Sequence, residues 1–137
     1  MDYRIVAALL FLAMTPALEA GEPKAEDRIA SLVAADQRPD AATTKELAKG
    51  GAMLIDVRTD EEWKEGHVKG AKLAPWQTLE LSSPVLPKDK AAPIVTYCRS
   101  GARAQLAAQK LRGLGYTRVV AMTGGFEDLK AAGMPTE

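Results

Sequence analysis

Short apolar runs alternate with helical patterns along most of this chain, and this alternation limits the folds that it can adopt. The alternation extends from residue 43 to residue 132. Strands separated by helices usually pair in parallel, because the intervening helix returns the chain to the end from which it started. We therefore expect an α/β fold with a mainly parallel central sheet and helices on both of its faces. The expected strands are 53–57, 71–73, 93–97 and 118–122, and the expected helical segments are 43–48, 60–65, 77–81, 102–114 and 126–132.

The N-terminus has the pattern of a signal peptide. A short polar start is followed by an apolar run over residues 5–14, and small residues follow at Ala17 and Ala20. The apolar run is about half of the ~20 residues that a bilayer-spanning helix needs. We expect residues 1–20 to be a signal peptide that is cleaved after Ala20. The product would be periplasmic or secreted and would not be stably inserted in a membrane. Leu18 and Asp2 depart from the usual signal pattern, so an uncleaved anchor is the alternative.

The rest of the chain divides into two parts. Residues 21–42 are charged and rich in alanine, and we interpret them as a leader helix and linker. Ile29, Leu32 and Val33 form a stripe on this helix that would suit a docking surface. Residues 43–137 are expected to form a single domain and to function as a monomer. The formal net charge is zero, which gives no reason to expect a nucleic acid as partner.

Cys98 is the only cysteine in the chain, so an internal disulfide is impossible. Exported proteins ordinarily use their cysteines in disulfides. The thiol is therefore inert and buried, paired with another molecule, or used in chemistry.

The sequence around Cys98 favours chemistry. A buried-strand pattern ends just before it and a helical pattern begins at Ala102, which places Cys98 in a strand-to-helix loop. Such loops lie at the carboxyl edge of a parallel sheet, where helix N-termini attract anions. A thiol beside a helix N-terminus and the side chains of Arg99 and Arg103 is stabilised as the nucleophilic thiolate. Gly101 allows successive N–H groups to face one concavity, which would hold a sulfonate, a phosphate or a persulfide.

Five sequence pieces in register resemble the rhodanese family of sulfurtransferases, single-domain type. The resemblance covers about residues 43–135, most of the chain that follows the signal. The matching pieces are LIDVR at 54–58, GHVKGA at 66–71, CRSGAR at 98–103, GGF at 124–126 and AGMP at 132–135.

The resemblance implies a rhodanese-like fold and a thiosulfate sulfurtransferase. Cys98 would take the sulfane sulfur of thiosulfate or a related small anionic donor as a persulfide. Cyanide, a thiol or a protein acceptor would then receive it. The backbone N–H groups of the loop would bind the anion, and the two arginines would hold the sulfonate end of the donor. The resemblance implies no metal and no organic cofactor. The substrate-binding residues expected from it are Arg99, Ser100, Gly101, Ala102 and Arg103.

Two further residues have roles implied by the resemblance. Asp56 ends a strand pattern and should lie on the same sheet edge as Cys98, where it would orient Arg58 or Arg103. His67 is the only histidine, and the resemblance gives it a structural role in a turn rather than the role of a catalytic base.

Different functions fit parts of this pattern. A cysteine phosphatase loop has five residues between cysteine and arginine, whereas four residues separate Cys98 from Arg103 here. Ser100 resembles enzymes that use mercaptopyruvate, whereas Arg99 is retained, so the loop pattern is mixed. The additional Arg103 favours a thiosulfate-like donor. The chain would also suit a non-catalytic module for partner binding or sulfur relay, and its lone thiol would suit an oxidation sensor.

Overall fold

A sheet of parallel strands forms the centre of the computed structural model, which describes residues 23–137. In this part of the chain the strand order is β2-β1-β3-β4, and every neighbouring pair is parallel. The carboxyl ends of the strands therefore lie at one edge. The strands are β1 (Met53–Asp56), β2 (Lys72–Leu73), β3 (Ile94–Tyr97) and β4 (Val119–Ala121).

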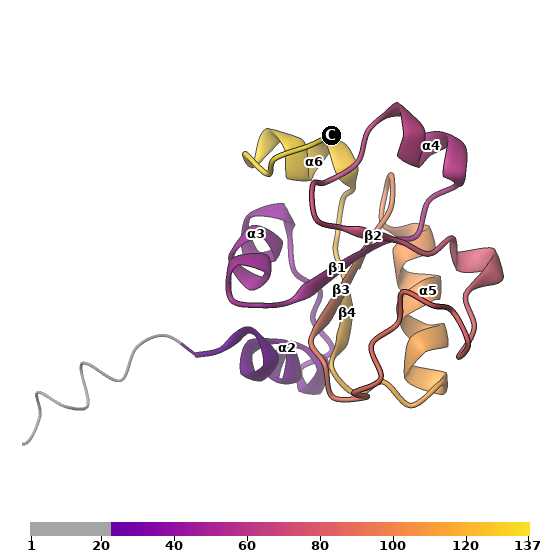
Figure 1. Ribbon diagram of the computed structural model, residues 1–137. Coiled ribbons are helices and arrows are strands. Elements are labelled where there is room, and N and C mark those ends of the chain that lie inside the picture. The colour runs from indigo at the N-terminus through magenta and orange to yellow at the C-terminus, as the bar shows by residue number, and fades with distance from the viewer. Residues whose placement is uncertain (1–22) are drawn as a thin grey trace, which may run out of the picture.

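Helices cover both faces of this sheet (Figure 1). On one face lie α2 (Ala25–Ala34), α3 (Ala41–Lys49) and α6 (Phe126–Ala131). On the other lie α5 (Ala102–Gly113) and a short 3-10 turn, η1 (Trp76–Thr78). Helix α4 (Asp60–Glu65) follows β1 at the carboxyl edge of the sheet. The predicted α/β class, with a parallel sheet between two helical layers, is confirmed.

Successive side chains of each strand point to opposite faces of the sheet, so each strand contributes to both hydrophobic layers. Leu54 and Val95 face the layer of α2, α3 and α6, whereas Ile55 and Ile94 face the layer of α5. All four side chains are buried. Such nearly continuous apolar runs are typical of strands that are covered on both faces, which is why they were readable in the sequence.

The predicted elements between residues 43 and 132 are all present. Their ends lie within two residues of the prediction, except that η1 ends at Thr78 rather than at Leu81. Helix α5 packs on the sheet without its first leucine, since Leu106 is 45% exposed. The buried stripe of this helix is formed mainly by small residues: Ala104, Ala107, Ala108 and Leu111. Small alanine side chains allow α5 to approach the sheet closely. A search for large apolar side chains at helical spacing does not identify such a face.

The helix expected within residues 21–42 is α2, and it belongs to the same hydrophobic core as the sheet. Ile29 is fully buried and Ala25 nearly so, and the helix packs against β4 and α3. Leu32 and Val33 are partly buried against the same core. The expectation that Ile29 contributes to an external docking surface is therefore wrong, because the chain's own core covers it.

The signal peptide expected over residues 1–20 lies outside the described residues. Within residues 23–137, no helix combines the length and the apolar content needed to cross a bilayer.

Candidate active site

The loop between β3 and α5 folds its backbone around the sulfur of Cys98. The Sγ atom accepts hydrogen bonds from the backbone N–H of Gly101 at 3.0 Å and of Ala104 at 3.4 Å. Gly101 has φ 103°, a left-handed conformation that favours glycine, and it turns the chain into α5. The Cys98 side chain has no exposed surface. The arrangement is a cradle of amide donors that suits a sulfur anion.

The loop that follows β4 supports this cradle. The N–H of Phe126 donates to the carbonyl of Cys98 at 2.8 Å. A Cβ atom on Gly125 would overlap the carbonyl of Arg99 and would lie 2.7 Å from the carbonyl oxygen of Cys98. Only glycine therefore permits this close approach of the two loops. The sequence piece GGF consequently has a packing role directly beneath the cradle.

Asp56 and Arg58 form a buried ion pair at the same edge. Asp56 lies opposite Tyr97 in the register of β1 and β3, next to the cradle as predicted. Arg58 Nε lies 3.0 Å from Asp56 Oδ1, and Arg58 Nη2 lies 2.8 Å from Oδ2. Arg58 Nη2 also donates to the carbonyl of Gly66 at 2.6 Å. Of the two partners left open for Asp56, the structure shows Arg58.

Aromatic rings and burial reinforce this pair. The Arg58 guanidinium lies over the ring of Phe126, 4.5 Å from its centroid, and 5.9 Å from that of Tyr97. Burial lowers the pKa of Arg58, but the hydrogen bond and charge of Asp56 outweigh burial, and the net pKa is raised. Burial raises the pKa of the Tyr97 phenol, whose oxygen accepts a hydrogen bond from the N–H of Val68. The site is thus braced by a buried ion pair that lies against two aromatic rings.

Arg103 pairs with Glu62, a residue that the sequence reasoning did not select. Arg103 Nη1 lies 2.6 Å from Glu62 Oε1, and Nη2 lies 3.0 Å from Oε2. The hydrogen bond from Arg103 lowers the pKa of Glu62 to about 2. Glu62 also completes a capping box with Thr59 at the start of α4. This pair ties α4 to the first turn of α5, next to the cradle.

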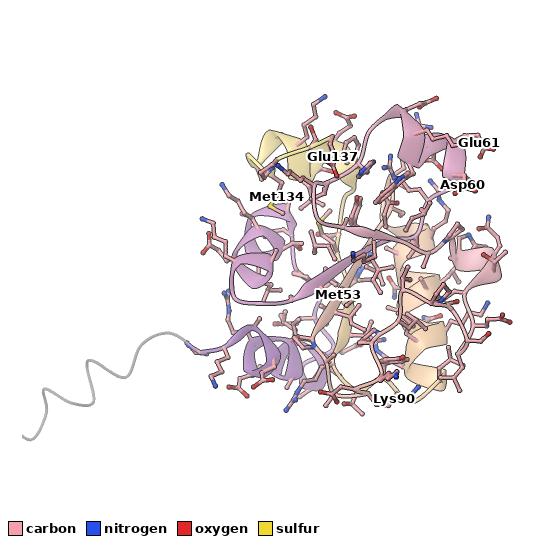
Figure 2. All side chains as sticks on the ribbon, in the orientation of Figure 1. Met53, Asp60, Glu61, Lys90, Met134 and Glu137 are labelled. Carbon is pink, nitrogen blue, oxygen red and sulfur yellow. The ribbon has the colours of Figure 1, made fainter. Side chains whose placement is uncertain are left out.

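An open cleft of about 480 Å³ adjoins the cradle. Arg99 lines it with an exposed side chain, which makes no hydrogen bond or ion pair with any residue of 23–137. Ser100 and Ala102 are also exposed, whereas Cys98 is not part of the cleft lining. Figure 2 shows Asp60, Glu61 and Glu137 at this end of the molecule and Lys90 at the opposite end. The cleft lining is Arg58, Glu62, Glu65, Gly66, Arg99, Phe126, Glu127, Lys130, Thr136 and Glu137.

His67 is engaged away from the cradle. Its ring stacks on Trp63 with centroids 3.5 Å apart and planes 4° from parallel. Nδ1 lies 2.9 Å from the carbonyl oxygen of Trp63, and Nε2 lies 3.4 Å from Glu137 Oε1. Neither ring nitrogen contacts Cys98, which agrees with the structural role expected for this histidine.

A comparison with known families decides the classification. The family model described as Rhodanese-like domain matches residues 40–132, which is most of the chain. This chain belongs to the rhodanese family. The match includes the cradle, the buried Asp56–Arg58 pair and the Glu62–Arg103 pair. It begins after α2, so that helix lies outside the matched residues.

Named relatives place the chain among the sulfurtransferases of this family. A protein of Allochromatium vinosum named sulfurtransferase is 35% identical over 83 residues, which cover 61% of this chain and 76% of the relative. The thiosulfate sulfurtransferase GlpE of Ectopseudomonas mendocina is 32% identical over 93 residues, covering 68% and 83%. The uncharacterized protein YqhL of Bacillus subtilis is 36% identical over 94 residues, covering 66% and 73%. A sulfurtransferase-family role with a sulfur donor and a sulfur acceptor follows.

Solved structures of rhodanese proteins share the fold. The rhodanese-like domain of Alr3790 from Anabaena, solved by NMR, aligns with a TM-score of 0.64 at 30% identity, over 73% of this chain and 77% of that one. A rhodanese with anions from E. coli aligns with a TM-score of 0.55 at 30% identity, over 64% of this chain and 98% of that one.

Proposed function

We propose that this rhodanese moves the sulfane sulfur of thiosulfate through a persulfide on Cys98 to cyanide or a thiol acceptor. The observation that carries the proposal is the cradle, in which Cys98 Sγ accepts hydrogen bonds from the amides of Gly101 and Ala104. Donors fixed around a sulfur anion stabilise the thiolate before attack and the persulfide after it.

The first half-reaction loads the enzyme. The Cys98 thiolate attacks the outer sulfur of thiosulfate and forms a new S–S bond. The S–S bond of thiosulfate breaks, and sulfite leaves with the electron pair. Arg99 is the side chain best suited to hold the sulfonate end, because it faces the cleft and has no partner among residues 23–137. Arg103 is less available, since Glu62 already neutralises its charge.

The second half-reaction unloads the enzyme. The acceptor, a thiolate or cyanide, attacks the outer sulfur of the persulfide. The bond between that sulfur and Cys98 Sγ breaks, and the thiolate of Cys98 is regenerated. The backbone amides of Gly101 and Ala104 then bind the Cys98 thiolate again. The products are thiocyanate or a persulfide of the acceptor, and no electrons are gained or lost overall.

A thiocyanate assay tests this proposal. Purified protein is incubated with thiosulfate and cyanide beside the variant Cys98→Ser and a phosphate-ester control. The wild type should form thiocyanate, the serine variant should not, and the phosphate ester should remain intact. Equal thiocyanate formation by both proteins would refute the proposal, and ester hydrolysis would favour a phosphatase.

Mass spectrometry gives a second and independent test. After treatment with thiosulfate alone, the wild type should gain the mass of about one sulfur atom on Cys98. A protein that gains no mass and makes no thiocyanate would be a binding module. A protein that accepts sulfur but transfers it only to a protein thiol would be a relay.

We also propose that the chain is exported to the periplasm or secreted. The proposal rests on the sequence pattern of residues 1–20 alone. Residues 1–25 fused to a reporter that is active only outside the cytoplasm should give activity. A reporter that works only in the cytoplasm would refute the proposal.

A further inference from the structure

Arg38 bonds to three backbone carbonyls behind the cradle. Its Nη2 atom donates to the carbonyl oxygens of Gly101 and Met122, each at 2.9 Å. Its Nε atom donates to that of Ala121 at 3.0 Å. The residue lies two positions before the residues that match the family. We propose that Arg38 is a positioning residue that fixes the Gly101 turn and thereby aims the loop amides at the sulfur of Cys98.

Gly101 is the point at which Arg38 acts on the cradle. The N–H of Gly101 donates to Cys98 Sγ at 3.0 Å, and its carbonyl accepts from Arg38 and from the N–H of Gln105. A glycine without support can rotate to many backbone conformations. With its carbonyl held from behind, the N–H groups that follow are left facing the sulfur. The packing is tight, since a Cβ on Gly101 would lie 3.1 Å from Arg38 Nη2.

The segment that carries Arg38 is itself anchored beside the site. The carbonyl of Pro39 accepts a hydrogen bond from the N–H of Thr123 at 2.9 Å. Arg38 therefore links Ala121 at the end of β4, and Met122 after it, to Gly101, the N-cap residue of α5. The guanidinium is partly buried, and charge-assisted hydrogen bonds are stronger than neutral ones. A planar fork can serve several acceptors at fixed angles, which the ammonium of a lysine cannot do.

The matched control is Arg112, another arginine that donates to a carbonyl of β4. Its Nε and Nη2 atoms lie 3.3 and 2.8 Å from the carbonyl oxygen of Val119, at the opposite end of the strand. Arg112→Ala removes the same kind of bond without touching the cradle. Arg38→Ala removes the proposed support, and Arg38→Lys keeps the charge and most of the stem. If Arg38→Ala does not fold, Arg38→Lys takes its place and is compared with Arg112→Ala.

The first measurement is native-state hydrogen exchange of the loop amides by NMR. Amides lose protection when their local structure opens more often. The Gly101 and Ala104 amides should exchange about tenfold faster in Arg38→Ala, whereas amides at the core of β1 and β3 should change little. Arg112→Ala should leave the two loop amides as they are in the wild type. The proposal would be overturned if the exchange rates of the two loop amides were unchanged in Arg38→Ala, or if they rose equally in Arg38→Ala and Arg112→Ala.

The second measurement is persulfide formation on Cys98 at saturating thiosulfate, and only this arm rests on the proposed function. Misplacement of catalytic groups by about 1 Å can cost on the order of a hundredfold in rate. Arg38→Ala should slow the reaction about ten- to a hundredfold with a smaller change in KM, and Arg38→Lys should not restore the rate. Full rescue by lysine, or an equal loss in Arg112→Ala, would overturn the positioning role. If the wild type forms no persulfide, the proposed function fails, and the exchange measurement still decides the role of Arg38.

Discussion

Arg103 and Glu62 are joined by two hydrogen bonds, at 2.6 and 3.0 Å, across the 41 positions that separate them in the chain. The pair fastens α4 to α5 next to the Cys98 loop. It also places a carboxylate beside a loop that is expected to bind a dianion. Glu62 therefore offsets part of the positive charge that the sequence assigned to substrate binding.

Glu62→Gln should strengthen the binding of thiosulfate. Glutamine can keep the capping box with Thr59. It removes the charge and one of the two hydrogen bonds from Arg103, because an amide nitrogen cannot accept a hydrogen bond. Loss of ~1 kcal/mol of repulsion corresponds to a KM lower by about fivefold. Steady-state kinetics with thiosulfate and cyanide measure this. Glu61→Gln, in the same helix but exposed, is the control and should change KM little. A higher KM in Glu62→Gln alone would show that the pair aligns the site rather than tuning its charge.

The same pair should make stability depend on pH in the acid range. The pKa of Glu62 is lowered from 4.5 to about 2 in the folded protein, so its carboxylate stabilises the fold at pH values above 4.5. This contribution is lost as pH falls from 4.5 through 2. The pair is partly exposed, so we expect only ~1–2 kcal/mol. Urea unfolding of the wild type and Glu62→Gln should differ at pH 7 and converge near pH 2. A constant difference across that range would contradict the prediction.

Asp56→Asn should destabilise the protein strongly. The Asp56–Arg58 pair is buried, and removal of one partner leaves an uncompensated charge, which typically costs ~3–5 kcal/mol. The double variant Asp56→Asn with Arg58→Met should be more stable than Asp56→Asn alone, because the buried charge is removed with its partner. Chemical denaturation of the three proteins measures both effects. A double variant less stable than the single one would show that the stacking of Arg58 on Phe126 matters more than the charge.

Gly125→Ala should disrupt the cradle, because the new Cβ would overlap the carbonyl of Arg99. We expect a loss of ~1–3 kcal/mol in stability from overpacking and a marked fall in sulfur transfer. Gly113→Ala is a matched control, since a Cβ there meets nothing within 4 Å and lies in the last turn of α5. That control should keep full activity and gain up to ~1 kcal/mol. Thermal melts and the thiocyanate assay separate the two variants, and normal activity in Gly125→Ala would contradict the packing role.

Arg99→Ala should weaken donor binding and leave the maximal rate nearly unchanged. Loss of a charge-assisted hydrogen bond of ~1.5 kcal/mol raises KM about tenfold. The effect should shrink at high salt, because salt screens an exposed charge. Arg28→Ala, on α2, removes the same net charge far from the cleft and is the control. Equal effects in both variants would attribute the change to the overall charge of the protein.

Local sequence patterns predicted most of this fold, since strands covered on both faces and glycine-bounded helices leave short-range signals. Cys98, its loop and Asp56 were found in the same way, because each marks the end of a strand. Glu62 and Arg38 were not found. Their partners lie 41 and at least 63 positions away, and a distant contact leaves no trace in local periodicity. Glu62 carried a weak signal, since Thr59 and Glu62 have the spacing of a capping box. That spacing accounts for the contact of Glu62 with Thr59 but not for its contact with Arg103.

The complete burial of Cys98 has a consequence for what can react with it. Cys98 has no exposed surface and is wrapped by backbone amides, so we expect it to react only with a group that projects a single narrow atom into the loop. The terminal sulfur of thiosulfate, cyanide and the end of an unbranched thiol meet that requirement. A disulfide flanked by folded polypeptide does not. We therefore expect the cradle to discriminate by size as well as by charge, and to protect Cys98 from mixed disulfides with bulky proteins.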